Sequence, residues 1–161
     1  MTENFEIKSA TKNDAGIILE LIKEIAAYEK LADQVEATEE QIINHLFSEK
    51  TYAECIIGFE NNIPIGFALF FHNYSTFVSR PGIYLEDLFV KEKYRGKGYG
   101  KKLLLSLVKI ADERNCGRVE WSVLDWNKPA IDFYESLGAT PMNEWTVYRL
   151  NQVAINKLNN K

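Results

Sequence analysis

Long hydrophobic runs are absent from this chain of 161 residues, and none approaches the roughly 18 apolar residues that a membrane-spanning helix requires. The first residues, Met-Thr-Glu-Asn, lack the basic and apolar regions of a secretory signal peptide. We therefore expect a cytoplasmic protein that does not bind membranes.

Cysteine and histidine are also scarce, with two residues of each kind. Cys55 and Cys116 lie in hydrophobic stretches without partners at the spacing of a metal site, which predicts two reduced and buried thiols. His45 and His72 are isolated, and we interpret both as structural or surface residues. We expect no bound metal, and neither cysteine lies in a pattern that indicates a nucleophile.

Positive charge is in deficit, because 23 acidic and 19 basic residues give a net charge of −4. This balance argues against broad nucleic-acid binding, which requires a basic domain. The basic residues are unevenly distributed, however, and seven of them lie with one acid between Lys91 and Lys109. A basic cluster in an acidic chain indicates an anionic cofactor and is compatible with a cationic substrate.

The composition, 46% hydrophobic and 26% charged, is that of a globular protein, and the length fits a single domain over residues 1–161. Apolar periodicity and turn residues predict a sequence of elements along the chain. The expected strands are 5–8, 52–60, 63–74, 83–90, 118–123 and 145–150, and the expected helices are 13–30, 38–47, 100–115 and 129–137. We expect a loop over 75–82 and a helix end or a loose tail after 151. This order predicts a mixed α/β fold, with a twisted sheet of about six to seven strands and helices on both faces.

One stretch organises the chain: a buried strand, Ile83 to Val90, then Gly96, Gly98 and Gly100, then an amphipathic helix. The start of a helix leaves about four backbone N–H groups without partners, and the helix dipole adds partial positive charge there. Glycines allow a ligand to approach that backbone. The stretch therefore predicts an anion site, with phosphate as the expected ligand.

Three phosphate motifs can be compared with this stretch. The P-loop fails, because Lys101 stands where its second glycine is required. The dinucleotide fingerprint has its third glycine one position later, although Glu120 lies about where that fold has its acidic residue. The third pattern, Arg95-x-x-Gly98-x-Gly100 between a strand and a helix, resembles the pyrophosphate loop of the GNAT-type N-acetyltransferases. The plainer alternative is a glycine-rich turn with solvated lysines.

The resemblance extends from about residue 5 to 150 and is more specific elsewhere in the chain. The stretches Tyr84-Leu85-Glu86-Asp87, Trp126-Asn127-x-Pro129 and Phe133-Tyr134 are similar to those of the diamine and polyamine N-acetyltransferases. The resemblance implies the GNAT fold, acetyl-CoA as the acetyl donor and a homodimer.

Catalytic roles can be considered for three side chains. An alkyl ammonium, with a pKa near 10, must lose a proton before it attacks a thioester, and a carboxylate can accept that proton. The resemblance implies that Glu86 is this base, directly or through water. Because adjacent strand residues point to opposite faces, we interpret Asp87 as structural. The resemblance also implies that Tyr134 protonates the leaving thiolate, whereas helical spacing alone favours a core aromatic.

Further residues are predicted to bind the two substrates. For acetyl-CoA, the resemblance implies Leu88, Phe89 and Val90, the residues Arg95, Gly96, Lys97, Gly98, Tyr99, Gly100 and Lys101, and also Asn127, Pro129 and Ala130. For the amine, the candidates are Tyr28, Glu29, Glu86, Glu120, Trp121 and Glu144, because carboxylates and aromatic faces attract ammonium groups. Each acid taken singly could equally be a solvated surface residue.

The resulting hypothesis is direct acetyl transfer from acetyl-CoA to a primary amine of a small diamine or polyamine. Glu120 and Ala27 differ from the residues expected in animal polyamine enzymes, which points to a different amine preference. The alternatives within the enzyme class are thialysine, another lysine analogue or a peptide amine. The alternative from another class is a non-catalytic module that binds CoA or a nucleotide.

Overall fold

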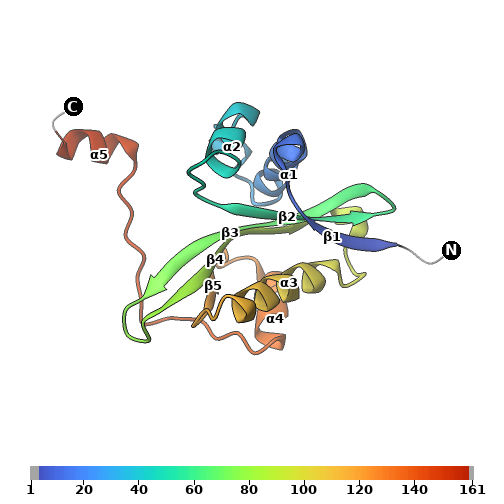
Figure 1. Ribbon diagram of the computed structural model, residues 1–161. Coiled ribbons are helices and arrows are strands. Elements are labelled where there is room, and N and C mark those ends of the chain that lie inside the picture. Colours follow the sequence, from blue (N-terminus) through green and yellow to red (C-terminus); the bar gives the residue numbers. More distant parts are fainter. Residues whose placement is uncertain (1–3, 160–161) are drawn as a thin grey trace. The chain divides into compact units, whose positions relative to one another are not determined.

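The computed structural model describes residues 4–159, which divide into two compact units, 4–122 and 123–159. The first unit contains a five-stranded sheet with α-helices on either side of it (Figure 1). Its elements in chain order are β1 (Phe5–Ser9), η1 (Lys12–Asp14), α1 (Ala15–Tyr28), η2 (Ala32–Gln34), α2 (Glu39–Leu46), β2 (Glu54–Glu60), β3 (Ile63–Ser75), β4 (Arg80–Val90), η3 (Glu92–Tyr94), α3 (Tyr99–Glu113) and β5 (Val119–Trp121). The second unit contains α4 (Lys128–Ser136) and α5 (Gln152–Leu158).

The strands lie in the order β1-β2-β3-β4-β5, antiparallel except for the parallel pair β4 and β5. Helices α1 and α2 cover one face of the sheet, and α3 covers the other (Figure 1). Apolar residues at helical spacing, such as Ile18, Leu21 and Ile25 of α1, pack with Ile57 and Phe67 of the sheet in one buried cluster. The predicted mixed α/β fold with helices on both faces is thus confirmed.

Local signals placed the helices well. Thr38 and Gln41 form a capping box at the start of the predicted helix 38–47, a pattern that spacing alone identifies. The Thr38 hydroxyl accepts from the Gln41 N–H at 3.2 Å, and the Gln41 side chain accepts from the Thr38 N–H at 2.9 Å. Helix α4 has Pro129 in its first turn, where proline is tolerated, and ends before Gly138, whose φ of +88° is the left-handed conformation common after a helix.

The strand predictions need correction. The sheet has five strands among the described residues, not six to seven, and the segment 145–150 is irregular. Its β-favouring side chains, including Trp145 and Tyr148, are exposed, and no ladder joins this segment to another described strand. A strand forms only when a neighbour pairs with its backbone, so side-chain propensity alone was insufficient.

The predicted loop over 75–82 is also too long, because β3 continues to Ser75 and β4 begins at Arg80. In the C-terminal tail, the Asn151 side chain caps α5 by accepting from the Ala154 N–H at 3.0 Å. None of the helices in the described part of the chain is both long and apolar enough to cross a membrane.

A register shift between β3 and β4 determines which side chains of β4 point to which face of the sheet. Leu69 of β3 pairs with Asp87, but the next residue, Phe70, pairs with Leu85, so Glu86 has no partner residue on β3. This is a β-bulge, which bends a strand and changes the direction of its side chains. Leu69 contacts the core beneath α1 and α2, and Asp87 therefore points to that face as well.

Candidate active site

The second half of β4 has an open edge. β4 pairs with β3 along its length, but it pairs with β5 only from Ile83 to Leu85. From Glu86 to Val90 no ladder occupies the β5 side among the described residues of the first unit. An exposed strand edge presents N–H and C=O groups that can bind an extended, amide-containing ligand. The predicted pantetheine contacts of Leu88, Phe89 and Val90 lie on this edge.

The glycine-rich loop follows that edge directly. Gly96 and Gly98 both have φ of +80°, a left-handed conformation that side chains with a Cβ rarely adopt. Gly98 is also the N-cap of α3, where no side-chain cap bond forms and no acid lies in the first turn. Glycine has no side chain that could cap the helix, so neither the N-cap residue nor an acid of the first turn competes with an anion there.

Gly100 differs from the other two glycines. It lies inside α3 without a positive φ, and a Cβ built there would meet only Val90 Cγ2, at 3.9 Å. Neither backbone strain nor crowding within the described residues therefore requires glycine. Since glycine destabilises a helix relative to alanine, its presence fits a ligand that must approach the backbone closely.

Arg95 is held against α1 at the start of the loop. Its Nε donates to the Val90 carbonyl oxygen at 2.8 Å, and its Cζ lies 4.3 Å from the ring centre of Tyr28 and 5.4 Å from that of Phe89. These contacts combine a hydrogen bond with two cation–π interactions. The structure thus brings together Arg95, predicted to bind the cofactor, and Tyr28, predicted to bind the amine.

Acidic residues gather at the other end of the open edge. Glu86 is exposed at the bulge, whereas Asp87 is mostly buried. Burial raises the pKa of Asp87 from 3.8 to about 6, and the charges of Glu86 and Glu29 add to this effect. Burial also raises the pKa of Glu29. A carboxyl group that titrates near neutral pH is suited to proton transfer, so the structural interpretation of Asp87 stays a prediction.

Glu120 and Trp121 are adjacent on β5 and therefore point to opposite faces of the sheet. The Glu120 carboxylate accepts from Asn73 Nδ2 at 2.8 Å and pairs with Arg118 Nε at 2.9 Å. An amine substrate would have to share a carboxylate that these two groups already contact. The geometry thus weakens the prediction that both residues bind the amine.

The remaining predicted residues belong to the second unit. Asn127 is the N-cap of α4, and its carbonyl oxygen accepts from the Ala130 N–H at 3.1 Å, with Pro129 between them. Tyr134 lies on α4 with its ring centre 5.3 Å from that of Phe133. Glu144 lies in the irregular segment that follows and is exposed. The roles of these residues stay predictions.

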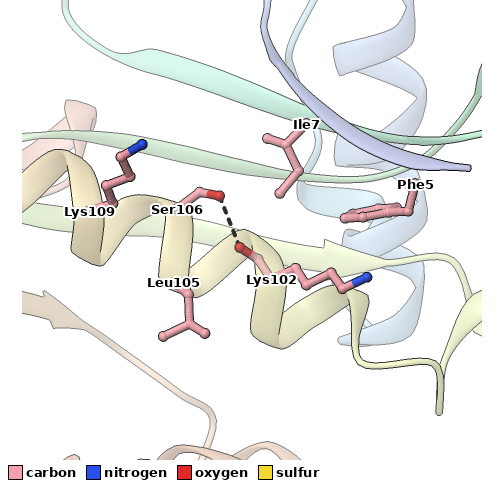
Figure 2. A pocket seen from close by; sticks show the side chains of 6 residues that line it. All are labelled: Phe5, Ile7, Lys102, Leu105, Ser106 and Lys109. Carbon is pink, nitrogen blue, oxygen red and sulfur yellow. Dashed lines mark hydrogen bonds between the residues drawn. The ribbon is translucent and has the colours of Figure 1, made fainter.

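Two other sets of residues can be set aside as sites. Burial raises the pKa of the Cys55 thiol to about 12, which agrees with the expected inert thiol and not with a nucleophile. A surface pocket between β1 and α3, of about 400 Å³, is lined by Phe5, Ile7, Lys102, Leu105, Ser106 and Lys109 (Figure 2). None of these six is a predicted site residue.

Sequence reasoning missed Glu60, Asn73 and Arg118. Each has a polar side chain that contacts a predicted site residue. The contacting residues are between 2 and 47 positions apart in the sequence. An isolated acid or amide in a strand gives no motif. Four consecutive residues of β2, Cys55 to Gly58, are buried, so no alternation of buried positions singles out Glu60 either.

Comparison with known proteins agrees with this geometry. The model of the acetyltransferase (GNAT) family matches residues 18–139, a range that includes parts of both units. A thialysine N-epsilon-acetyltransferase of Bos taurus is 37% identical over 166 residues, which cover 96% of this chain and 97% of the relative. A human spermidine/spermine N(1)-acetyltransferase-like protein 1 is 31% identical over 92% of this chain and 23% of its own length.

A solved structure is similar over nearly its whole length. An integron cassette protein from the mobile metagenome of V. cholerae has a TM-score of 0.79 and 32% identity, with 98% of each chain covered. The family match, the relatives and the open β4 edge that leads to a glycine-rich loop all agree with the predicted fold. The chain belongs to the GNAT family of N-acetyltransferases, which take their acetyl group from acetyl-CoA.

Proposed function

We propose that the chain acetylates a primary amine of a small, cationic acceptor, a diamine or polyamine or a lysine analogue such as thialysine. The observation that carries this proposal is the difference in charge between the two ends of the open β4 edge. Cations and the N-terminus of α3 lie at its C-terminal end, and Glu29, Glu86 and Asp87 lie at its other end. This arrangement suits an anionic donor and a cationic acceptor that meet along one strand.

The donor is proposed to bind along β4 and the loop. The edge from Leu88 to Val90 would pair with the amides of pantetheine, and the N–H groups from Gly96 to Lys101 would bind the diphosphate. Gly100 fits this assignment, because a Cβ would occupy the space over the backbone that the diphosphate needs. Asn127, Pro129 and Ala130 would contact the thioester end of the donor.

Two proton transfers are proposed for the reaction. Glu86 would accept a proton from the acceptor ammonium, directly or through water, and the free amine would then attack the thioester carbonyl. The C–S bond breaks as the C–N bond forms, and Tyr134 would protonate the departing thiolate. Transfer would be direct, since the raised pKa of Cys55 leaves this thiol protonated and unsuited to an acyl-enzyme.

Asp87 is a second candidate for the base. Its carboxyl group titrates at about 6, and the neighbouring charges of Glu86 and Glu29 contribute to this pKa. A base works best when its pKa lies near the working pH. If Asp87 accepts the proton, kcat in Asp87→Asn falls at least as far as in Glu86→Gln.

The residues predicted to bind the acceptor differ in how well the structure supports them. Glu29 is the best supported, because it lies close enough to Asp87 to affect its pKa. Tyr28 would contribute an aromatic wall beside Arg95, although its ring already faces the guanidinium. Glu120, Trp121 and Glu144 remain weaker candidates for this site.

Several properties of the whole protein are also part of the proposal. We expect a single functional domain over residues 1–161, working as a homodimer in the cytoplasm, with no nucleic-acid or membrane partner. The free cysteines support a reducing compartment. Exposed apolar residues after α4, such as Trp145, Val147 and Leu150, are consistent with a contact to a second copy.

The test is thiol release from acetyl-CoA with a panel of acceptors: diamines, polyamines, thialysine and other lysine analogues, an aminoglycoside and one peptide. Wild type is run beside Tyr134→Phe and Glu86→Gln. Turnover with a free small amine, reduced by about 10²-fold or more in each variant, supports the proposal. A peptide that outcompetes every free amine contradicts the small-acceptor assignment, and binding of acetyl-CoA without any turnover favours a non-catalytic module.

A further inference from the structure

Glu60 is a buried carboxylate that contacts the glycine-rich loop. It is the last residue of β2 and only 8% exposed. A buried carboxylate is stable only when it is paired and hydrogen-bonded. The Tyr99 hydroxyl donates to Glu60 Oε1 at 2.5 Å, and Lys97 Nζ donates to the same oxygen at 2.9 Å. These two hydrogen bonds, that of Tyr99 first, lower the pKa of Glu60 below its usual range.

Both partners of Glu60 lie within the predicted anion site. Lys97 stands between Gly96 and Gly98, the two residues with φ of +80°, and Tyr99 is the first residue of α3. The Tyr99 ring is buried and stacks on Phe5 of β1, with ring centres 4.2 Å apart. Glu60 and Phe5 therefore hold the start of α3 to two strands of the sheet.

Such an attachment favours binding. Glycines have the greatest conformational freedom of any residue, so a loop with two of them loses much entropy when it is fixed on a ligand. Contacts that fix the loop beforehand reduce this loss and increase affinity. The ammonium of Lys97 offsets the negative charge of Glu60, which leaves geometry as the main effect of the acid on an anionic ligand.

We infer that Glu60 is a positioning residue for the diphosphate of the acyl donor, which acts through Tyr99 and Lys97 and does not touch the donor. This inference rests on the proposed function, because it assigns the anion site to the diphosphate of acetyl-CoA. Glu60 fixes the direction of the α3 N–H groups, and it has no part in the proton transfers.

The opposite end of the same strand provides a matched control. Glu54 begins β2 and binds Arg114, the C-cap of α3, through two hydrogen bonds of 2.6 and 2.8 Å. Glu54 and Glu60 thus join the same strand to the two ends of the same helix. Only the contact of Glu60 lies at the predicted anion site. Glu54→Gln therefore makes the same charge change at the other end of α3, in a more exposed pair, without altering the loop.

The experiment is calorimetric titration of CoA into wild type, Glu60→Gln, Tyr99→Phe, Glu54→Gln and the double variant of Glu60 and Tyr99. Glu60→Gln replaces two charge-assisted hydrogen bonds by weaker neutral-acceptor ones, and Tyr99→Phe removes one of them. Each change is expected to weaken CoA binding about fivefold. Tyr99→Phe keeps the stacked ring, and it tests the contact even if Glu60→Gln does not fold. The affinity of the double variant for CoA is at most about twofold lower than that of the single variant with the lower affinity, because both substitutions act on the same contact. Glu54→Gln binds as wild type does.

Kinetics separate positioning from general destabilisation. In Glu60→Gln and Tyr99→Phe the KM for acetyl-CoA rises in proportion to the Kd for CoA. The kcat at saturation of both substrates stays within about twofold of wild type. With S-acetylpantetheine, a donor that lacks the diphosphate, kcat/KM equals that of wild type. The inference is overturned if Glu60→Gln and Tyr99→Phe bind CoA as tightly as wild type or more tightly, or if the acetylpantetheine reaction falls equally. A wild type that binds no CoA contradicts the proposed function itself.

Discussion

The two ends of the open β4 edge differ in charge and in the way their charged groups are held. At the loop end, Gly96 and Gly98 have left-handed backbone conformations, and Glu60 and Phe5 hold the start of α3 to the sheet. At the bulge end, Glu86 is exposed and Asp87 is partly buried near other acids, where its pKa rises to about 6. One end therefore suits binding of a fixed anion, and the other suits exchange of a proton.

The largest effect is expected from Gly100→Glu. A carboxylate in the first turn of α3 suits the helix dipole but occupies the space of the diphosphate and repels it. We predict that CoA binding weakens by at least about 100-fold, without a loss of thermal stability, as measured by calorimetry and thermal unfolding. Gly100→Ala is the matched control: it stabilises the fold by roughly 0.5–1 kcal/mol and yet weakens CoA binding. Tighter CoA binding in either variant would refute the assignment of the site.

The opposite end is tested by Glu86→Gln, which keeps the shape of the side chain and removes its charge. We predict a fall in kcat of about 10²-fold, as expected for a general base, with the Kd for CoA unchanged. The measurement is steady-state thiol release together with CoA titration. An equal loss of CoA affinity would mean that the two ends do not act separately.

Asp87→Asn tests whether burial raises the pKa of this acid. The test compares how the free energy of unfolding of variant and wild type depends on pH. Because the folded-state pKa is raised from 3.8 to about 6, the folded protein holds this proton more tightly than the unfolded chain. Ionisation therefore lowers the stability of wild type as the pH rises through this range. We predict that Asp87→Asn is more stable than wild type at about pH 8, by no more than about 3 kcal/mol, with a smaller gain at about pH 5. Urea unfolding at the two pH values checks this, and a gain that does not depend on pH would count against it.

The smallest effect is expected at the far end of α3. The hydrogen bond to Arg114 lowers the pKa of Glu54, so this pair contributes stability above the usual carboxylate pKa and loses it as the pH falls. Both side chains are more than a third exposed, and Glu54→Gln should lower stability by at most about 1 kcal/mol at neutral pH. This pH dependence has the opposite sign to that of Asp87→Asn. A loss of several kcal/mol would show that the pair is more than a surface contact.

The sequence predicted the parts of the molecule that depend on neighbouring residues. The glycine-rich loop, the capping box at Thr38 and the apolar face of α3 all follow from spacing within a few residues, and the structure agrees with each. Contacts between distant residues were out of reach. The bulge that turns Asp87 toward α1 depends on the register with β3, and the bond between Glu60 and Tyr99 joins residues 39 positions apart.

The segment 145–150 shows the limit of side-chain propensity. Its alternating apolar residues predicted a strand, but a ladder needs a second backbone, and none of the described strands pairs with it. The length of β5, three residues, was likewise fixed by pairing with Ile83 to Leu85 and not by its own composition. The open edge of β4, on which the proposed site depends, is the direct result of that short pairing.

The division of the β4 edge between donor and acceptor can be measured directly by backbone amide NMR, with CoA and a free diamine titrated separately. CoA should shift the amide signals from Gly96 to Lys101, and the diamine should shift those of Glu29, Glu86 and Asp87 while leaving the loop unchanged. If CoA leaves the loop amides unshifted, or if the diamine perturbs the loop and not the acids, the assignment of the two ends is wrong.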